Sequence, residues 1–312
     1  MEIAIKFLSL HKITDKANSL TEMGKSATSL VTGFLDSLGA TFKSCLRMLP
    51  ALGNRGPSRQ SGASSGKPLV ILGNGPSLRR NLEEDMAVLQ GADTLAVNFF
   101  ANSPEFLQVR PKYYVLADPH FFDKADTDPN VGRLISVLNS IDFAMTLLIP
   151  AAARRKARLF VNPLLRVETF NFVAVEGFRW FEDAMFGHRF GMPRPRNVLI
   201  PSIMIGIWLG YKQIYLLGAD HSWLSTLSVN DRNEVVSIQP HFYKEDDREQ
   251  KRIRQEYVRH PLHEVLESMT IAFRSYHRIQ AYASAHGISI VNATPGSMID
   301  AFPREPLAST NS

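Results

Sequence analysis

Short apolar runs alternate with helical patterns along most of the chain after residue 67. The runs are nearly continuous in Val, Ile and Leu, which is typical of parallel strands that are covered on both faces. The pattern therefore predicts an α/β fold, a Rossmann-like, doubly wound and mainly parallel sheet with helices on both faces. The predicted strands are residues 69–73, 94–100, 113–118, 143–150, 157–162, 213–220 and 289–294.

Residues 1–50 show a different pattern, that of an amphipathic helix. Their apolar residues recur at steps of three and four and form one stripe: Ala27, Leu30, Val31, Phe34, Leu38, Phe42, Leu46 and Leu49. Lys25, Lys43 and Arg47 lie off this stripe. Two interpretations stay open. The helix lies on an anionic membrane surface, or it packs on the core or on a second subunit of a homo-oligomer.

The pattern divides the chain into a helical segment, a linker and a catalytic domain. Residues 1–52 are the helical segment, and residues 53–67, GNRGPSRQSGASSGK, have the Gly/Ser content of a flexible linker. Residues 68–312 form the nucleotide-binding domain. Within it, residues 222–262 are dense in charge and poor in core residues, which predicts a mobile insertion over the carboxyl edge of the sheet. The alternative is an ordinary solvated loop.

Composition narrows the class of protein. Hydrophobic residues make up 45% and charged residues 21% of the chain, as in globular proteins. A single cysteine, Cys45, excludes a disulfide framework and favours a reducing compartment. The net charge of +5 suits an anionic small molecule or an acidic membrane as the binding partner. The sequence contains no dense basic stripe of the kind that binds nucleic acid.

Localisation follows from two segments. The N-terminus lacks the apolar core of a signal peptide, and the longest apolar run, residues 198–211, is too short and proline-broken to span a membrane. We therefore expect a cytoplasmic protein, or one that is peripheral at the inner membrane face.

A glycine-containing turn follows the first predicted strand, in LVILGNGPSL, residues 69–78. Gly73 and Gly75 let the backbone turn sharply and approach a ligand, and Pro76 suits the first turn of a helix. The free amides of that helix start, together with Ser77, favour an anion. The turn therefore predicts a phosphate site, against the alternative of a plain strand-to-helix connection.

Two residues argue against a dinucleotide site. Leu78 replaces the third glycine of the G-x-G-x-x-G pattern, and the second strand leads to Asn98 instead of an acidic residue that would hold a ribose diol. Asn98 can still hydrogen-bond a base or a sugar. The G-x-S-x-G, Walker A and H-E-x-x-H motifs are missing from the sequence.

Asp220 and His221 follow another predicted strand, at the edge where ligands bind in such sheets. Asp220 is a candidate general base, hydrogen-bond partner of a sugar hydroxyl, or metal ligand; its alternative role is to cap the next turn. Asp118 ends a further strand in the same way. Two carboxylates at neighbouring strand ends would hold Mg²⁺ with a triphosphate. Trp223 stacks on a ligand ring or packs in the protein.

Three segments occur in order and at wide spacing: GNGPSL (73–78), LGYKQIYLLGADHSW (209–223) and VNATPGSMIDAFPR (291–304). Together they resemble the bacterial family-42 sialyltransferases and the MptE-like proteins, which are named for an archaeal 6-hydroxymethylpterin diphosphokinase. The latter also look related to the motility-associated flagellin glycosyltransferases. The resemblance covers patches of residues 68–304 and implies a Rossmann-like fold whose GNGPSL turn meets the phosphates of a nucleotide.

The resemblance to the sialyltransferases implies a CMP-linked sugar donor and a reaction that needs no metal or other cofactor. His120 stands where the family has a donor-binding asparagine, and Arg196 lies near the position of a family arginine. Asn292, Thr294 and Ser297 are expected in the last loop over the nucleotide. The candidate nucleotide-binding residues are Gly73, Asn74, Gly75, Pro76, Ser77, Asn98, Asp118, His120, Arg196, Asp220, His221, Asn292, Thr294 and Ser297.

Glycosyl transfer to a hydroxyl needs a base near neutral pH, and histidine has a suitable pKa. In the sialyltransferases a lid histidine precedes the last long helix, which is predicted here over about residues 262–285. His263 and His260 compete for that role, with His241 behind them. We favour His263 because it lies at the predicted helix start. The alternative for each is an ordinary surface histidine.

Three functions follow from these observations. The first is a glycosyltransferase that moves a sugar from a nucleotide-activated donor to a glycan, lipid-linked or protein acceptor, with residues 1–50 directing it to a membrane. The second is an MptE-like pyrophosphokinase that uses ATP and Mg²⁺ held by Asp118 and Asp220. The third is a non-catalytic nucleotide-binding module.

Overall fold

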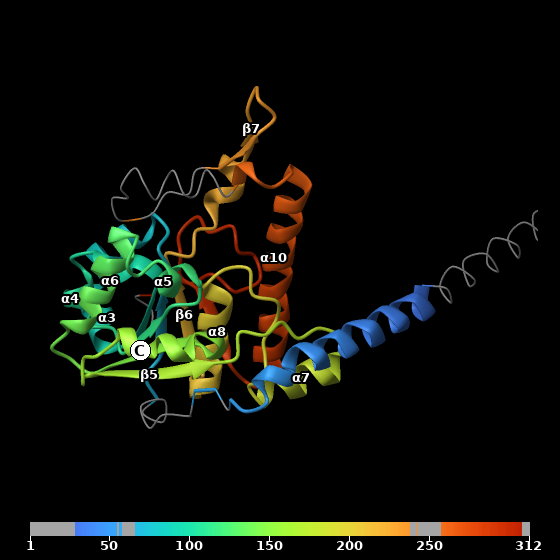
Figure 1. Cartoon of the computed structure of the whole chain (residues 1–312), viewed down its shortest axis with the longest axis horizontal. Coiled ribbons are helices and arrows are strands. Elements are labelled where there is room, and N and C mark those ends of the chain that lie inside the picture. Colours follow the sequence, from blue (N-terminus) through green and yellow to red (C-terminus); the bar gives the residue numbers. More distant parts are fainter. Residues whose placement is uncertain (1–28, 55, 58–65, 238–241, 243–256, 308–312) are drawn as a thin grey trace, which may run out of the picture.

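The computed structural model describes residues 29–54, 56–57, 66–237, 242 and 257–307. Its centre is a seven-stranded sheet in the order β5-β4-β3-β2-β1-β6-β9, with every neighbouring pair parallel (Figure 1). The predicted Rossmann-like α/β fold is therefore confirmed. The strands are β1 (Leu69–Leu72), β2 (Asp93–Val97), β3 (Tyr113–Val115), β4 (Met145–Pro150), β5 (Leu165–Phe170), β6 (Gln213–Leu217) and β9 (Ser289–Asn292).

The order of the strands reverses at β1. From β1 the chain builds outward through β2, β3, β4 and β5, and then returns to place β6 on the other side of β1. Leu72 at the end of β1 lies opposite Ala96 of β2 and Leu217 of β6. Because the connections leave β1 and β6 in opposite directions, the carboxyl ends of these two strands border a crevice, which is where open α/β sheets bind ligands.

Helices cover both faces of the sheet, and this explains why the strands are continuously apolar. Leu69 and Ile71 point into the cluster of buried side chains that contains α8 and α10, whereas Val70 and Leu72 point into the cluster on the opposite face. The helices are α2 (Leu78–Glu84), α3 (Met86–Gly91), α4 (Phe106–Val109), α5 (His120–Asp123), α6 (Pro129–Asn139), α7 (Arg179–Gly187), α8 (Leu199–Leu209) and α10 (Leu262–Ala285). Short 3-10 helices are η1 (Leu49–Ala51), η3 (Asn98–Asn102), η4 (Ala151–Leu159) and η5 (Ser222–Thr226).

Helix α8 is the apolar run of residues 198–211, and all of its side chains are buried. The side chain of Asn197 accepts the amides of Leu199 and Ile200 at its start, and Gly210 ends it in the left-handed conformation (φ 97°). The run is thus an inner helix of the domain. No helix in the described part of the chain is long and apolar enough to cross a membrane.

One predicted strand is wrong. Residues 157–162 do not form a strand, because residues 151–159 form η4, and the strand that follows is β5 at Leu165–Phe170. β5 is one of the two edge strands of the sheet, and only its first and last side chains are buried. A search for continuous apolar runs finds strands that are covered on both faces, and it therefore passed over this edge strand.

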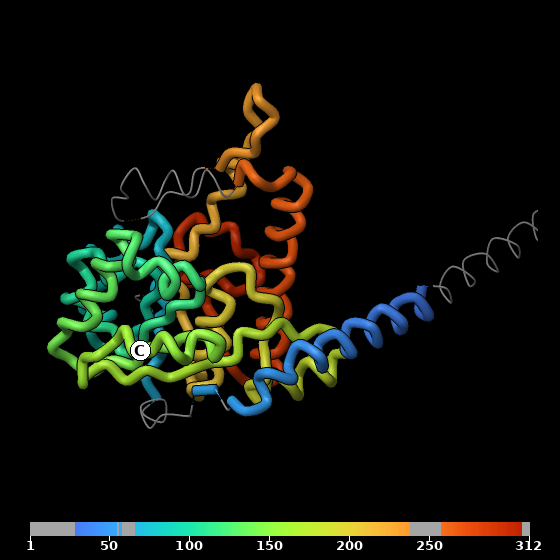
Figure 2. Tube along the Cα trace, in the orientation of Figure 1, coloured from blue at the N-terminus to red at the C-terminus, as the bar shows by residue number. Residues whose placement is uncertain are grey.

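The N-terminal helix is confirmed for its described part, residues 29–48, and Ala27 and Lys25 lie outside the described residues. Figures 1 and 2 show this helix leaving the body of the molecule beside α7. Its inner face carries Ser44, whose hydroxyl donates to the carbonyl of Glu176 at 2.8 Å, and the buried Met48. The large residues of the apolar stripe keep 49–73% of their surface exposed, so the interpretation that the stripe packs on the core is wrong.

The segment predicted as an insertion, residues 222–262, stands at the carboxyl edge of the sheet where it is described. β7 (Ser228–Val229) and β8 (Val235–Val236) form an antiparallel hairpin beyond the sheet, next to the start of α10 (Figure 1). Val235 packs there on Val265 and Met269. The amide of Phe242 donates to the carbonyl of Asn74, so the segment reaches the glycine turn. That it acts as a lid stays a prediction.

Because α8 packs closely on the sheet, we expect substitutions at two helical glycines to differ in their effect on the free energy of unfolding. A Cβ at Gly206 would lie 2.8 Å from Leu69 Cδ2, whereas nothing lies within 4 Å of a Cβ at Gly39. We expect Gly206→Val to lower the free energy of unfolding by about 1–3 kcal/mol. The control Gly39→Ala should change it by less than about 1 kcal/mol, in the stabilising direction. Urea unfolding checks both values, and equal effects would contradict this packing.

Candidate functional site

The loops that follow β1 and β6 lie directly against each other at the crevice. The amide of Gly73 donates to the carbonyl of Leu217 at 2.7 Å, and the amide of Gly75 donates to the carbonyl of Gly218 at 2.8 Å. A Cβ at Gly73 would lie 2.5 Å from Gly218 O, and a Cβ at Gly75 would lie 1.9 Å from Asp220 Oδ2. Both glycines are therefore required by the contact between these two loops, in addition to any approach of a ligand.

Asp220 reaches from the β6 loop to the start of α2. Its carboxylate accepts the amide of Ser77 at 3.1 Å and the hydroxyl of Ser77 at 2.8 Å. The next amide, that of Leu78, donates to Gly75 O. The sequence predicted that the amide and hydroxyl of Ser77 would receive a phosphate, and in this structure they hold the carboxylate of Asp220. Asp220 thus caps the glycine turn across the sheet and not the turn that follows it.

Burial has the largest effect on the pKa of the Asp220 carboxyl. Only 9% of its surface is exposed, and this desolvation raises the pKa of its carboxyl. The two hydrogen bonds from Ser77 stabilise the charged form and oppose that rise, but burial is the larger effect. A buried carboxyl with a raised pKa in a ligand crevice is the kind of group that functional sites contain.

Asn74 and Asn98 complete the site on the other side of the turn. The side-chain amide of Asn74 donates to the carbonyl of Val97 at 3.2 Å, whereas its Oδ1 is buried and has no hydrogen-bond partner among the described residues. Asn98 follows β2 in the left-handed conformation (φ 50°), which asparagine tolerates. Since β2, β1 and β6 are neighbours, the structure brings Asn74, Asn98 and Asp220 to three adjacent strand ends.

His221 belongs to a buried polar network that the sequence did not predict. Its Nε2 lies 2.7 Å from the hydroxyl of Tyr276, and that hydroxyl donates to Asn197 Oδ1 at 2.9 Å. Burial lowers the pKa of His221 to about 3, so the ring is neutral at physiological pH. Trp223 packs on the His221 ring. The position of Asn197 directly before an apolar run is a helix-start signal and would have found one member; Tyr276 has no such signal.

The loop after β9 holds Asp220 in place. Asn292, Thr294 and Ser297 are at the predicted edge, but they are fully buried with protein partners. The Thr294 hydroxyl bridges Leu216 O and the amide of Ala219, and the Ser297 hydroxyl donates to Ala219 O at 2.6 Å. Thr294 and Ser297 therefore position the residue before Asp220, and in this structure the three side chains do not form a rim that is open to a ligand.

Asp118 does not share a site with Asp220. β3 is separated from β6 by β2 and β1, and at about 4.8 Å per strand the two strand ends are about 14 Å apart. Mg²⁺ holds its ligands at about 2.1 Å, so the prediction that both carboxylates bind one ion is wrong. Asp118 accepts the amide of His120, whose ring is 2.9 Å from Asp128. Among the described residues no group of three His, Cys, Asp or Glu side chains is placed to hold a metal.

The candidate histidines lie at the start of α10, which begins at Leu262 as predicted. His263 is exposed in the first turn, and His260 is exposed and 3.2 Å from Glu264. No hydrogen bond within the described residues joins either histidine to Asp220. Arg196 is exposed directly before Asn197, and His241 lies outside the described residues.

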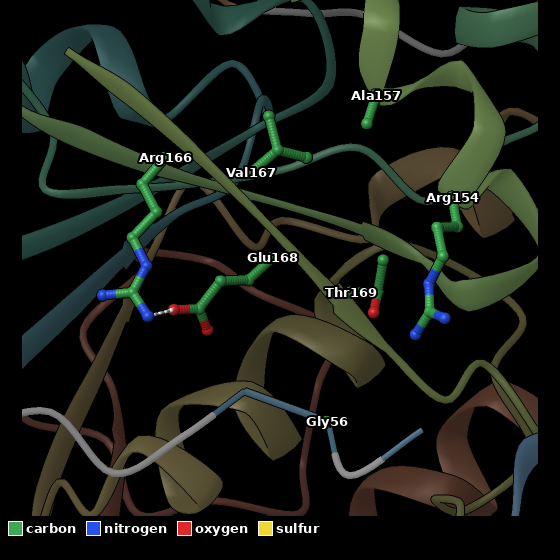
Figure 3. Close-up of a pocket in the computed structure, with 7 residues that line it drawn as sticks. All are labelled: Gly56, Arg154, Ala157, Arg166, Val167, Glu168 and Thr169. Carbon is green, nitrogen blue, oxygen red and sulfur yellow. Dashed lines mark ion pairs between the residues drawn. The ribbon is translucent and has the colours of Figure 1, made fainter. Parts of the chain in front are cut away.

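Two cavities lie away from the turn. One, of about 490 Å³, covers the carboxyl ends of β3, β4 and β5. The other, of about 350 Å³, lies along β5, where Figure 3 shows Arg154 and Arg166 on either side of Thr169. In that cavity Arg166 forms an ion pair with Glu168 at 2.7 Å. β5 is the far edge of the sheet from β1, so this second cavity is separate from the Asp220 site.

No family model matches the chain, and no curated protein matches it. Among solved structures, the chain is similar to the MAf glycosyltransferase from Magnetospirillum magneticum AMB-1, at 15% identity and a TM-score of 0.47. The match covers 83% of this chain but only 36% of the other, so the chain spans about a third of that protein.

The burial of Asp220 predicts a pH dependence of stability. Its folded pKa is raised above the unfolded value of about 3.9, so the contribution of Asp220 is greatest below that value and is lost as the pH rises through the folded pKa. The free energy of unfolding should therefore fall, relative to that of Asp220→Asn, as the pH rises from about 4. Urea unfolding over a pH series measures this difference.

The control for that series is Asp126→Asn, which removes one negative charge at an exposed position and corrects for the change in net charge. If the free energy of unfolding of the natural protein instead rises relative to that of Asp220→Asn as the pH increases, the hydrogen bonds from Ser77 outweigh burial.

Proposed function

We propose that the chain is a glycosyltransferase whose nucleotide-activated donor binds at the carboxyl ends of β1 and β6. The observation that carries this proposal is the arrangement of Asp220 and Asn74 around the glycine turn. The buried Oδ1 of Asn74, which has no hydrogen-bond partner among the described residues, lowers stability, and a hydrogen-bond donor of a ligand in the crevice would compensate for it. The buried Asp220 carboxyl, whose pKa burial raises, is the kind of group that functional sites contain, and it lies on the amide and hydroxyl of Ser77. The sequence resemblance supplies the sugar-transfer chemistry and the preference for a CMP-linked donor.

Asn74 would bind the nucleoside part of the donor. Its free Oδ1 accepts a hydrogen bond, and the ribose hydroxyls and the amino group of cytosine are donors of that kind. Asn98 lies at the next strand end and would contact the same moiety. Discrimination between nucleotides follows from this pair, since an unsatisfied buried acceptor costs about 1–3 kcal/mol when the ligand lacks a matching donor.

The donor phosphate would take the place of the Asp220 carboxylate at Ser77. Two anions repel each other there, so the phosphate binds when Asp220 turns away or takes up a proton, and the raised pKa of Asp220 favours the latter. The amide and hydroxyl of Ser77 then stabilise the leaving phosphate. The acceptor oxygen forms its bond to the anomeric carbon, the bond to the phosphate breaks, and His263 takes the acceptor proton. The role of His263 rests on the resemblance and on its place at the start of α10.

One observation favours the pyrophosphokinase as a second candidate. A divalent cation between Asp220 and the phosphates of ATP would also remove the repulsion at Ser77. Asp118 is too far away to share that ion, so Mg²⁺ would be held by Asp220 and the nucleotide. Metal dependence separates the two functions, because a chelator abolishes the kinase reaction and spares the transferase. The third function, a non-catalytic nucleotide-binding module, requires binding without turnover in either assay.

Nucleotide binding tests the site directly. A thermal-shift screen of CMP, CDP, UDP, GDP and ATP, with and without Mg²⁺, should show the largest stabilisation by CMP, without a need for metal. Asn74→Ala should weaken CMP binding by up to about tenfold, the value of one hydrogen bond. The matched control is Asn102→Ala, which also removes a buried Oδ1 without a partner among the described residues; Asn102 is at the opposite end of η3 from Asn98, and its side-chain amide donates to the carbonyl of Asn130. Equal effects of the two variants would contradict the site.

Turnover tests the roles of the ionisable groups. His263→Ala should retain CMP binding and lose transfer to a hydroxyl acceptor, whereas the exposed His277→Ala should retain both. Asp220→Ala should alter binding itself. Normal transfer in His263→Ala would move the base to His260 or to another residue, and stabilisation by ATP only with Mg²⁺ would favour the kinase.

The N-terminal helix suits a peripheral contact with a membrane, and we propose that this contact delivers the enzyme to its acceptor. Its stripe exposes Phe34, Leu38, Phe42, Leu46 and Leu49 along one face of the helix, and a large exposed apolar patch is typical of a membrane or protein contact. Phe34 contacts Phe178, which stacks on the exposed Trp180, so the apolar surface continues onto α7. Tryptophan is a side chain that membrane interfaces favour.

Two substitutions on this helix distinguish the loss of apolar contact from the addition of charge. Leu38→Glu places a carboxylate on the stripe, and Gly33→Glu places the same charge at an exposed position off it, where nothing lies within 4 Å. We expect Leu38→Glu to lower binding to phosphatidylglycerol vesicles by at least about tenfold, because one buried leucine contributes about 1.5–3 kcal/mol. Gly33→Glu should have a small effect in vesicle sedimentation. If instead the natural protein is a dimer that Leu38→Glu dissociates, a second subunit covers the stripe.

A further inference from the structure

The larger cavity lies at the same edge of the sheet as the glycine turn. Residues at or just after the ends of β3, β4 and β5 line it, among them Ala117, Pro150 and Phe172. Pro50 and Ala51, at the end of the N-terminal helix, form one wall. Its volume of about 490 Å³ is in the range of about 300–1,000 Å³ that small-molecule sites have. It is thus large enough for a second ligand beside the nucleotide crevice.

The lining of this cavity is apolar. Pro119, Phe122 and the three alanines 151–153 contribute to it, and few polar side chains do. One of those few, Asn171, is occupied by the protein: it donates to the carbonyls of Asn54 and Arg189 and accepts the side-chain amide of Asn54. A free glycan, which needs a hydrogen-bond partner for each hydroxyl, finds little here. The lining therefore fits an apolar chain or ring.

The charged groups in the wall add a preference for an anion. Arg47 and Lys156 line the cavity together with one carboxylate, Asp123; Arg47 pairs with Glu176 at 3.5 Å, so Lys156 is the cation on which the preference depends. Lys156 pairs with Asp123 at 3.1 Å, but both side chains are substantially exposed, so exchange of Asp123 for another anion costs little. η4, which supplies Lys156, has the sequence AAARRKARL and contains four cations and no acid.

We propose that this cavity binds an amphipathic anion, an apolar chain that ends in a phosphate, with the phosphate at Lys156 and the chain against Phe122 and Phe172. Leu49 and Leu52 are exposed beside the wall formed by Pro50 and Ala51, so a longer chain continues along the apolar surface of the N-terminal helix. This proposal rests on the proposed function in one respect only. If the chain is a glycosyltransferase, the ligand of the cavity is its acceptor, a lipid phosphate that is held next to the donor.

Decyl phosphate below its micellar concentration is the probe. Isothermal titration of the full chain should show saturable binding of decyl phosphate, weaker binding of decanol and none of inorganic phosphate. Ala152→Trp, which places an indole in the cavity mouth, should abolish it, whereas Ala152→Ser should not. Lys156→Ala should weaken it by about tenfold, the loss of one charge-assisted hydrogen bond. Arg155→Ala, a cation of η4 outside the lining, is the matched control.

Two results would overturn the proposal: no saturable binding of decyl phosphate, or binding that Ala152→Trp and Lys156→Ala leave unchanged. CMP binding is measured in the same variants and separates this failure from failure of the nucleotide site, because neither residue touches the glycine turn. Vesicles that contain phosphatidic acid show whether the natural ligand of the cavity is a membrane lipid or a free alkyl phosphate. Weaker vesicle binding of Ala152→Trp than of Ala152→Ser assigns the cavity to a membrane lipid, and equal binding assigns it to a free alkyl phosphate.

Discussion

The contact between Gly75 and Asp220 is the constraint on which the site depends. The two loops that border the crevice approach so closely that any side chain at position 75 would collide with the Asp220 carboxylate. This approach is possible because β1 and β6 are hydrogen-bonded neighbours whose connections leave in opposite directions. It puts a carboxylate on the amide and hydroxyl of Ser77, at the start of a helix, where the backbone itself favours an anion.

Groups around Asp220 hold it there at a cost in stability. His221 is in the left-handed conformation (φ 53°), which residues other than glycine seldom adopt although histidine does so more readily than most, and its ring is hydrogen-bonded to Tyr276, which in turn donates to Asn197. On the other side, Ser297 and Thr294 fix Ala219. Strain of this kind is found where a side chain must be held in one position for function. The same rigid frame would let a phosphate replace the carboxylate without rearrangement of the backbone.

Much of the fold was predictable from the sequence, because both faces of the sheet are buried and its central strands are continuously apolar. β1, β6 and the start of α10 follow directly from that pattern, and so does the glycine turn between β1 and α2. The edge strand β5 was missed because only part of it is buried. The end of η4 and the residues that follow it look like a strand in the sequence because Ala157, Leu159 and Phe160 occur there without a helical stripe.

The site was less predictable, because it depends on strand order. The sequence shows that Asp118 and Asp220 both follow strands, but only the order β3-β2-β1-β6 shows that they are too far apart to share an ion. The residues of the GNGPSL turn and Asp220 do meet, as their positions at strand ends suggested. That Asp220 would bind Ser77 depends on packing between residues 143 positions apart in the sequence, and that Asn74 Oδ1 has no partner among the described residues depends on the packing around the turn.

A crystal structure of the chain with the nucleotide that stabilises it most is the most direct test of the central claim. The account predicts a phosphate oxygen in hydrogen-bond contact with the amide of Ser77, the Asp220 carboxylate displaced from it, and a donor of the nucleoside on Asn74 Oδ1. A nucleotide bound elsewhere, with Asp220 still on Ser77, would contradict it.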